Sequence, residues 1–139
     1  MKIQLFIPEK QKQSIPFEDC EMVSVAQLEQ VPNASCNLIH IGNCGDFIGN
    51  YTTFYQLVCG KLRYGGHVVV EGNDLMEISF ALNRGFMTPA DAQQLVCMGR
   101  QICITRDEAE ATLQGCGLNI VKSRLSQYKY SIRAERPNV

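Results

Sequence analysis

Short apolar runs separated by polar turns divide the first half of the chain into strands and one helix. Residues 2–7, 22–25 and 37–41 are apolar-rich and are followed by proline or polar residues, which predicts three strands. Apolar residues recur at helical spacing over 51–63, which predicts a half-buried helix that Tyr64-Gly65-Gly66 stops. The β-branched run 67–71 lacks alternation and is typical of a strand covered on both faces.

The second half carries three helix starts and then a hairpin. A capping side chain precedes each helical segment: these are Asp74, Thr88 and Thr105. The segments 118–124 and 128–134 are separated by three residues and are expected to pair as antiparallel strands. Strands that alternate with helices predict an α/β fold, a three-layer sandwich whose mostly parallel sheet ends in an antiparallel C-terminal hairpin.

Composition restricts the classes of partner. The 139 residues are 45% apolar and 19% charged, which is ordinary globular composition, and their number predicts a single domain over 1–139. The formal net charge of −1 gives no electrostatic sign of nucleic-acid binding or of an anionic membrane partner. No apolar run is long enough for a membrane span, and no leader peptide is visible. We expect a protein of the cytoplasm.

The seven cysteines favour the same compartment. Their number is odd, and no two of them form a CxxC pair, the spacing that metal and redox motifs require. We therefore expect reduced thiols that pack as small apolar side chains, with no disulfide and no metal site.

Three segments match the motifs of one enzyme family in order and spacing. Residues 26–32 (AQLEQVP) match A-D-L-x-x-L-P, and residues 61–70 (KLRYGGHVVV) match L-(R/K)-P-G-G-x-(L/V)-x-(I/V). Residues 105–137 are similar to the final helix and closing hairpin of the same family. From about residue 26 onward the chain thus resembles the C-terminal half of a class I S-adenosylmethionine-dependent methyltransferase. The resemblance implies a Rossmann-like fold and S-adenosylmethionine as cofactor.

The N-terminal part departs from this family. Its members end the first strand with an acidic residue and a glycine-rich loop, which lets the backbone approach the cofactor. Here the first strand ends in Phe6-Ile7-Pro8, and no glycine precedes Gly42. The second strand lacks the acid that the family offers to the ribose, and Gln27 replaces the acid that faces adenine. We expect a truncated, degenerate member whose cofactor loop is lost.

The resemblance assigns candidate site residues by position. Asn43 and Asp46 follow the third strand, where the family places substrate-facing groups, and would be catalytic. The alternative is a polar turn in which Asp46 or Asn50 caps the next helix. A phosphate cradle formed by the glycines at 42, 45 and 49 is a third interpretation, but it lacks the Lys-Ser/Thr of a P-loop. The positions that would contact the cofactor are Ile7, Gln27 and Gly42.

Other polar and aromatic residues have structural interpretations that we favour. His40 lies within an apolar strand and is expected to be a packed, hydrogen-bonded residue. Asp74 is expected to cap a helix, although Glu71 and Asp74 could also face the candidate cleft. The apolar stripe of the segment 80–87 is expected to face the core, with a partner surface as the alternative; it comprises Phe80, Leu82, Phe86 and Met87.

Two functional hypotheses follow. We favour a degenerate methyltransferase-like protein without cofactor that acts as a non-catalytic binding or assembly module, as a homodimer or on a protein partner. The alternative is a minimal active methyltransferase that binds S-adenosylmethionine and methylates an unknown acceptor, since an activated sulfonium needs little more than an oriented, dry pocket. The alternative predicts an open pocket at the strand ends, and the favoured hypothesis predicts that Pro8, Phe17 or the loop 9–14 fills it. We expect compact relatives of this kind in phage or virus genomes.

Overall fold

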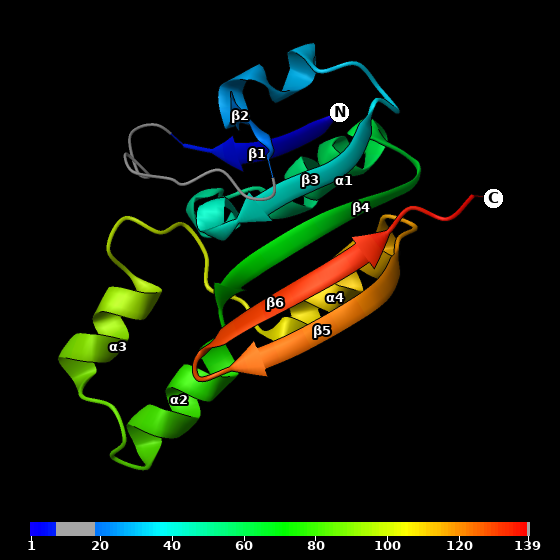
Figure 1. Ribbon diagram of the computed structural model, residues 1–139. Helices are drawn as coiled ribbons and strands as arrows, with labels where there is room; N and C mark the ends of the chain where they lie inside the picture. Colours follow the sequence, from blue (N-terminus) through cyan, green and yellow to red (C-terminus); the bar gives the residue numbers. More distant parts are fainter. Residues whose placement is uncertain (8–18, 139) are drawn as a thin grey trace.

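A six-stranded mixed sheet organises the molecule (Figure 1), in a computed structural model that describes residues 1–7 and 19–138. The strand order is β2-β1-β3-β4-β6-β5. The strands β1, β2, β3 and β4 run parallel, and β6 is antiparallel to both β4 and β5. The predicted α/β class, with a mostly parallel sheet and a closing antiparallel hairpin, is confirmed. The strands are β1 Lys2–Phe6, β2 Glu21–Ser24, β3 Cys36–Gly42, β4 Leu62–Asn73, β5 Asn119–Ser126 and β6 Lys129–Glu135.

Four α-helices and two short 3-10 helices connect the strands. They are η1 Val25–Gln30, η2 Asn43–Phe47, α1 Tyr51–Lys61, α2 Leu75–Asn83, α3 Pro89–Val96 and α4 Arg106–Gly115. The three predicted caps are confirmed: Asp74, Thr88 and Thr105 accept main-chain N–H groups at the starts of α2, α3 and α4, at 3.0, 3.2 and 3.2 Å. A side-chain acceptor there satisfies an N–H that the helix itself cannot pair.

The strand β4 is longer than the sequence pattern predicts. It begins at Leu62, so α1 ends at Lys61 and the Gly65-Gly66 pair lies inside the strand. Gly66 has a packing reason to be there, because a Cβ on it would lie 2.7 Å from the carbonyl oxygen of Cys36 on β3. The glycines therefore allow a close approach of two strands instead of ending a helix.

The main core lies between one face of the sheet and the helices α1 and α4, which Figure 1 shows behind the strands. The side chains of Ile39, Val68 and Ile132 point into it from three neighbouring strands, and Val58 and Leu113 meet them from the helices. All five are almost fully buried.

The helices α2 and α3 form a hairpin that projects away from the sheet (Figure 1) and has a small cluster of its own. Met87 is buried in this cluster, as expected. The prediction that Phe80, Leu82 and Phe86 face the core is wrong, since they are 52%, 39% and 73% exposed. The hairpin is too small to cover more than one side of α2. No helix in the described part of the chain is long and apolar enough to cross a membrane.

Candidate functional site

The three residues expected to contact the cofactor lie at the same end of the sheet. Ile7 follows β1 and Gly42 ends β3, and these strands are parallel neighbours in which Gln4 is opposite His40. Gln27 lies in η1, directly after β2, the other parallel neighbour of β1. The carboxyl ends of parallel strands are where open α/β sheets bind ligands. The topology therefore brings the three positions to one edge.

The side chains at this edge differ in how they could serve a ligand. Ile7 is half-buried and packs against the main core, whereas Gln27 is exposed. The strand β2 ends at Ser24, whose hydroxyl accepts the N–H of Ala26 at 3.4 Å and so caps η1. The serine takes the position at which the resemblance implies a carboxylate for the ribose. None of Ile7, Ser24 and Gln27 carries the carboxylate that the resemblance implies for the ribose and the adenine of S-adenosylmethionine.

The glycines after β3 are explained by packing. Gly42 has a φ of +58°, in the left-handed region that favours glycine, and a Cβ on it would lie 3.3 Å from the His40 ring. A Cβ on Gly45 would lie 3.1 Å from the hydroxyl of Tyr55. The main chain of Asn43 begins η2, but its side chain lies outside the described part of the structure. The backbone conformation of Gly42 and the close neighbours of Gly42 and Gly45 thus give both glycines a packing reason.

The carboxylate of Asp46 is buried beneath the segment that joins α3 to α4. The residue is only 4% exposed, and its Oδ2 lies 3.5 Å from Nε of Arg100. The main-chain N–H of Asn73, at the end of β4, also donates to this carboxylate. Burial raises the pKa of Asp46 to about 6, although Arg100 and the Asn73 hydrogen bond act in the opposite direction. The cap of the next helix that was expected of Asp46 or Asn50 is absent, because neither side chain caps α1.

The main chain of Asp46 holds the same segment. Its carbonyl oxygen accepts the N–H groups of Gln101 and Ile102 at 2.8 and 3.1 Å. The residues 100–102 are thus tied to η2 by one ion pair and two hydrogen bonds. This arrangement joins three parts of the chain, namely η2, the end of β4 and the α3–α4 connection, and it leaves Asp46 little access to an acceptor molecule.

Protonated groups surround Asp46 on its inner side. Burial raises the pKa of the Cys44 thiol to about 12, and it also raises the pKa values of the Tyr55 and Tyr130 phenols. All three groups are neutral at physiological pH, so none supplies a thiolate or phenolate nucleophile. Gly72 completes the packing, because a Cβ on it would lie 2.7 Å from Cζ of Tyr130 and 3.0 Å from Oδ1 of Asp46.

The remaining sequence candidates have structural partners. His40 is buried, and its Nε2 lies 3.5 Å from Oε1 of Glu71, as expected for a packed histidine. The hydrogen bond with His40 and the nearby Lys129 ammonium lower the pKa of Glu71. Burial of the carboxylate acts in the opposite direction but is the weaker effect. Asp74 accepts N–H groups from both Glu77 and Arg106, at 3.0 and 2.8 Å. These residues therefore stabilise strands and helix ends.

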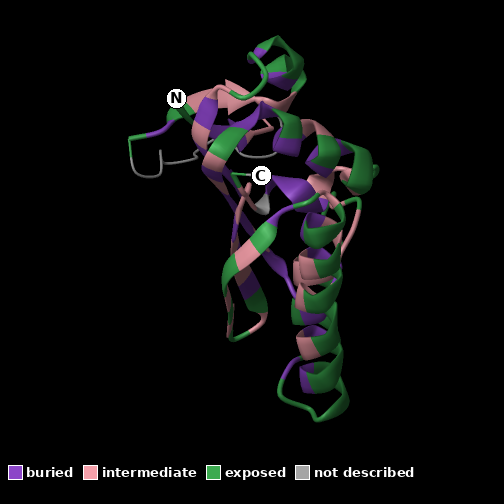
Figure 2. Ribbon diagram, turned by 90° about the vertical axis from the view of Figure 1, so that its right-hand side faces the viewer, coloured by how far each residue is buried: buried purple, intermediate pink, exposed green. Residues whose placement is uncertain are grey.

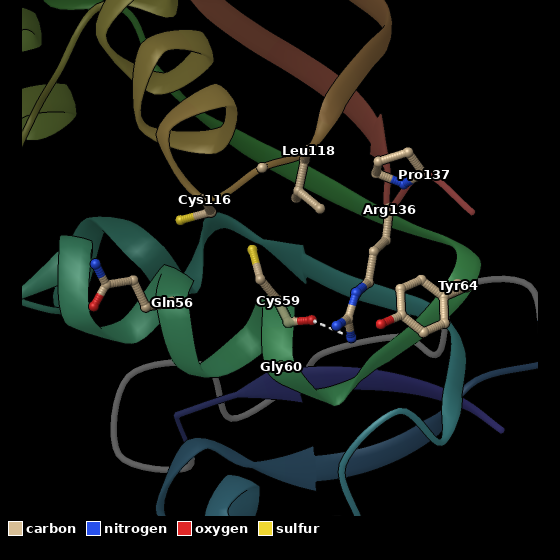
Figure 3. A pocket seen from close by; sticks show the side chains of 9 residues that line it. Gln56, Cys59, Gly60, Tyr64, Cys116, Leu118, Arg136 and Pro137 are labelled. Carbon is tan, nitrogen blue, oxygen red and sulfur yellow. Dashed lines mark hydrogen bonds between the residues drawn. The ribbon is translucent and has the colours of Figure 1, made fainter. Parts of the chain in front are cut away.

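Sequence reasoning missed a pocket of about 290 Å³ beside the C-terminal end of α1 (Figure 3). Arg136 lines it, but its Nη1 donates to the carbonyl oxygens of Leu62 and Cys59 at 2.6 and 3.3 Å. Its guanidinium also lies 4.5 Å from the centre of the Tyr64 ring. A cation at a helix C-terminus stabilises the unpaired carbonyls there. No local sequence signal reveals this contact, because Arg136 is far from α1 along the chain.

No group of three or more His, Cys, Asp or Glu side chains that could hold a metal ion occurs among the described residues. All seven cysteines are free thiols, of which Cys97 is exposed.

Comparison with solved structures shows the fold of S-adenosylmethionine-dependent methyltransferases. An O-methyltransferase family protein from Burkholderia thailandensis superimposes with a TM-score of 0.62 and 8% identity, over 85% of this chain and 36% of its own. The 1,6-didemethyltoxoflavin-N1-methyltransferase of the same organism, which was solved with S-adenosylhomocysteine, gives 0.58 and 13%, over 86% and 52%.

A third similar structure is a chain from the Haloferax volcanii complex between the Trm112 methyltransferase activator and a putative methyltransferase. It gives a TM-score of 0.61 and 9% identity, over 89% of this chain and 65% of that one. This chain thus spans from about a third to two thirds of the length of these structures. No protein-family profile and no curated protein sequence matches it.

Proposed function

We propose that the protein is a degenerate methyltransferase-like scaffold that acts as a non-catalytic binding or assembly module. The observation that carries the proposal is the position of Asp46. The residue at which the resemblance implies a substrate-facing group is 4% exposed and is held by Arg100 and by the N–H of Asn73. A carboxylate with these partners holds the α3–α4 connection in place, and its burial keeps a methyl-acceptor molecule from reaching it.

The cofactor positions support the same proposal. A first strand that ends in Phe6-Ile7 without a glycine-rich loop keeps side chains where the family brings its backbone close to the cofactor. Ser24 supplies a helix cap where a ribose carboxylate is implied. We therefore propose that the module works without S-adenosylmethionine. Pro8, Phe17 and the loop 9–14, which were expected to fill the pocket, lie outside the described residues.

A protein partner is consistent with the similar structures. The Haloferax chain comes from a complex that contains a methyltransferase activator, so a protein of this fold takes part in a protein assembly there. We propose that this chain likewise self-associates or docks onto a protein. Seven free thiols support a reducing compartment such as the cytoplasm.

Calorimetric titration of the purified protein with S-adenosylmethionine and S-adenosylhomocysteine tests the proposal. We expect no saturable heat at millimolar ligand and no rise in the melting temperature. A ligand at 100 times its dissociation constant would stabilise the native state by roughly 2.7 kcal/mol, which a melting curve resolves.

Saturable binding that Gln27→Ala weakens would contradict the proposal and favour the alternative, a minimal active methyltransferase. In that case Asn43→Ala and Asp46→Asn, the two candidate catalytic positions, should abolish methyl transfer while leaving the fold intact.

A further inference from the structure

The helix α2 is apolar on every side, yet most of it is exposed. Six of its nine residues are apolar, and only Ile78 and Ala81 are buried. Met76 is 64% exposed and Phe80 is 52% exposed. The lower end of the molecule in Figure 2, where α2 lies, is largely coloured as exposed. A helix that is apolar all round is normally buried on all sides. The outer side of α2 therefore lacks a partner that covers it.

Two exposed apolar residues of α2, Met76 and Phe80, form its outer stripe. They are four residues apart and therefore lie on one side of the helix, which the polar Asn83 continues toward the C-terminal end. Leu75 and Leu82 flank this outer stripe next to α3, where they line a hollow of about 280 Å³ between the two helices. Surfaces of this kind mark protein interaction sites.

The charges beside the outer stripe are arranged with opposite signs at the two ends. Glu77 lies in the first turn of α2, and Arg84 is its C-cap. The two residues are seven positions apart, so they lie on the same flank of the helix, and the guanidinium of Arg84 lies over the Phe80 ring at 4.1 Å. An antiparallel copy of α2 would bring its Arg84 beside Glu77 and its Glu77 beside Arg84.

We propose that the outer stripe is the interface of a twofold homodimer in which α2 packs antiparallel against α2 of a second copy. The inference rests on the proposed assembly function and names its partner. Twofold symmetry makes the contact self-complementary, with Phe80 facing Phe80 at the centre and two Glu77–Arg84 pairs along one flank. The helix dipoles are then opposed, which is the favourable orientation.

Charge argues against other occupants of the outer stripe. A parallel twofold copy would place the two Glu77–Arg84 flanks on opposite sides of the interface, so these charges would not pair. A membrane surface prefers helices with several Lys or Arg residues on the polar side. The hairpin from 74 to 97 instead contains one basic residue, Arg84, and three acidic residues, Asp74, Glu77 and Asp91.

Sedimentation equilibrium and light scattering at micromolar concentration test the interface with two charge reversals. We expect a wild-type dimer, whereas Glu77→Arg and Arg84→Glu should each be monomeric, because each sets like charges side by side. An equimolar mixture of the two variants should form a heterodimer, in which both pairs are again of opposite sign. This recovery requires that residues 77 and 84 of the two copies lie close together across the interface.

Matched controls separate the interface from the fold. Glu29→Arg reverses an exposed charge on η1, which follows the edge strand β2, and should remain dimeric. Phe80→Glu should be monomeric with an unchanged circular dichroism spectrum. A monomeric wild type, or a mixture of variants that stays monomeric, would overturn the dimer.

The outcome also separates this inference from the proposed function. A monomer that binds no S-adenosylhomocysteine overturns the dimer and keeps the non-catalytic scaffold. A dimer that binds S-adenosylhomocysteine keeps the interface and overturns the scaffold.

Discussion

Nε of Arg100 lies 3.5 Å from Oδ2 of Asp46, and the N–H of the next residue, Gln101, donates to the Asp46 carbonyl oxygen at 2.8 Å. Side chain and main chain of one aspartate thus hold the same connecting segment. Because this aspartate follows the third strand of the sheet, the anchor lies where the methyltransferase fold was expected to receive substrate. The interaction is the structural basis for the proposed loss of catalysis.

Replacement of Asp46 by Asn should change how the free energy of unfolding depends on pH. The native pKa of Asp46 is raised to about 6, above its ordinary value, so the native state binds the proton more tightly than the unfolded state. Its contribution to stability is therefore greatest at low pH and is lost as pH rises through 6. Relative to the wild type, Asp46→Asn should gain roughly 2–3 kcal/mol between pH 4 and pH 7.

Urea unfolding at a series of pH values measures this difference. Asp107→Asn, which removes an exposed carboxylate from α4, is the matched control and should show little change of this kind. If the difference in free energy of unfolding between Asp46→Asn and the wild type did not vary with pH, the pKa of Asp46 would not be raised in the native state.

Loss of the Asp74 carboxylate should destabilise two helices at once. Its two oxygens accept from Glu77 N at 3.0 Å and from Arg106 N at 2.8 Å. We expect Asp74→Ala to cost roughly 2–4 kcal/mol, because both N–H groups lose their acceptor, whereas Asp74→Asn keeps one acceptor and should cost about half as much. Thr88→Ala, which removes a single exposed cap, should cost about 1 kcal/mol. Thermal or urea unfolding measures these losses. If Asp74→Ala cost no more stability than Thr88→Ala, Asp74 would not cap two helices.

A methyl group at Gly72 should disrupt the packing above Asp46. A Cβ there would lie 2.7 Å from Cζ of Tyr130 and still closer to its hydroxyl. We expect Gly72→Ala to lose roughly 2–3 kcal/mol, and Tyr130→Phe to restore only part of that loss. Gly115→Ala is the control, because nothing lies within 4 Å of a Cβ at this helix position. It should be neutral or slightly stabilising, and a Gly72→Ala variant of wild-type stability would contradict the packing.

Native thiol labelling should be confined mainly to one cysteine. Cys97 is exposed, whereas Cys44, Cys59 and Cys103 have pKa values raised by burial to about 12, 12 and 11. Because the thiolate is the reacting form, Cys97 should label first with iodoacetamide at neutral pH. Mass spectrometry of the digested protein identifies the site. Cys97→Ser should remove the fast phase, and rapid labelling of Cys44 in the folded protein would contradict the buried cluster.

The local parts of the fold could be predicted from the sequence because their signals are local. Asp74, Thr88 and Thr105 each stand just before an apolar-periodic segment, and each caps the predicted helix. The Gly65-Gly66 pair misled the prediction, since the same dipeptide can stop a helix or let two strands approach. Only the three-dimensional neighbour, the carbonyl of Cys36, distinguishes the two uses.

The candidate site was predicted in position but not in its contacts. Ile7, Gln27 and Gly42 do lie at one end of the sheet, because parallel strands align their carboxyl ends. The partner of Asp46 is Arg100, more than fifty positions away, and no local pattern announces such a pair. The exposure of Phe80 was missed for a similar reason, since an apolar stripe has the same pattern whether it faces the core or another chain.

The central claim is that the strand ends no longer form a cofactor site. Amide chemical shifts of the labelled protein, followed during addition of S-adenosylhomocysteine to millimolar concentration, test it at the residues themselves. We expect that the amide chemical shifts of Ile7, Gln27 and Gly42 do not change. Saturable chemical-shift changes centred on these three amides would contradict this claim and would show that the protein binds the cofactor product at the strand ends.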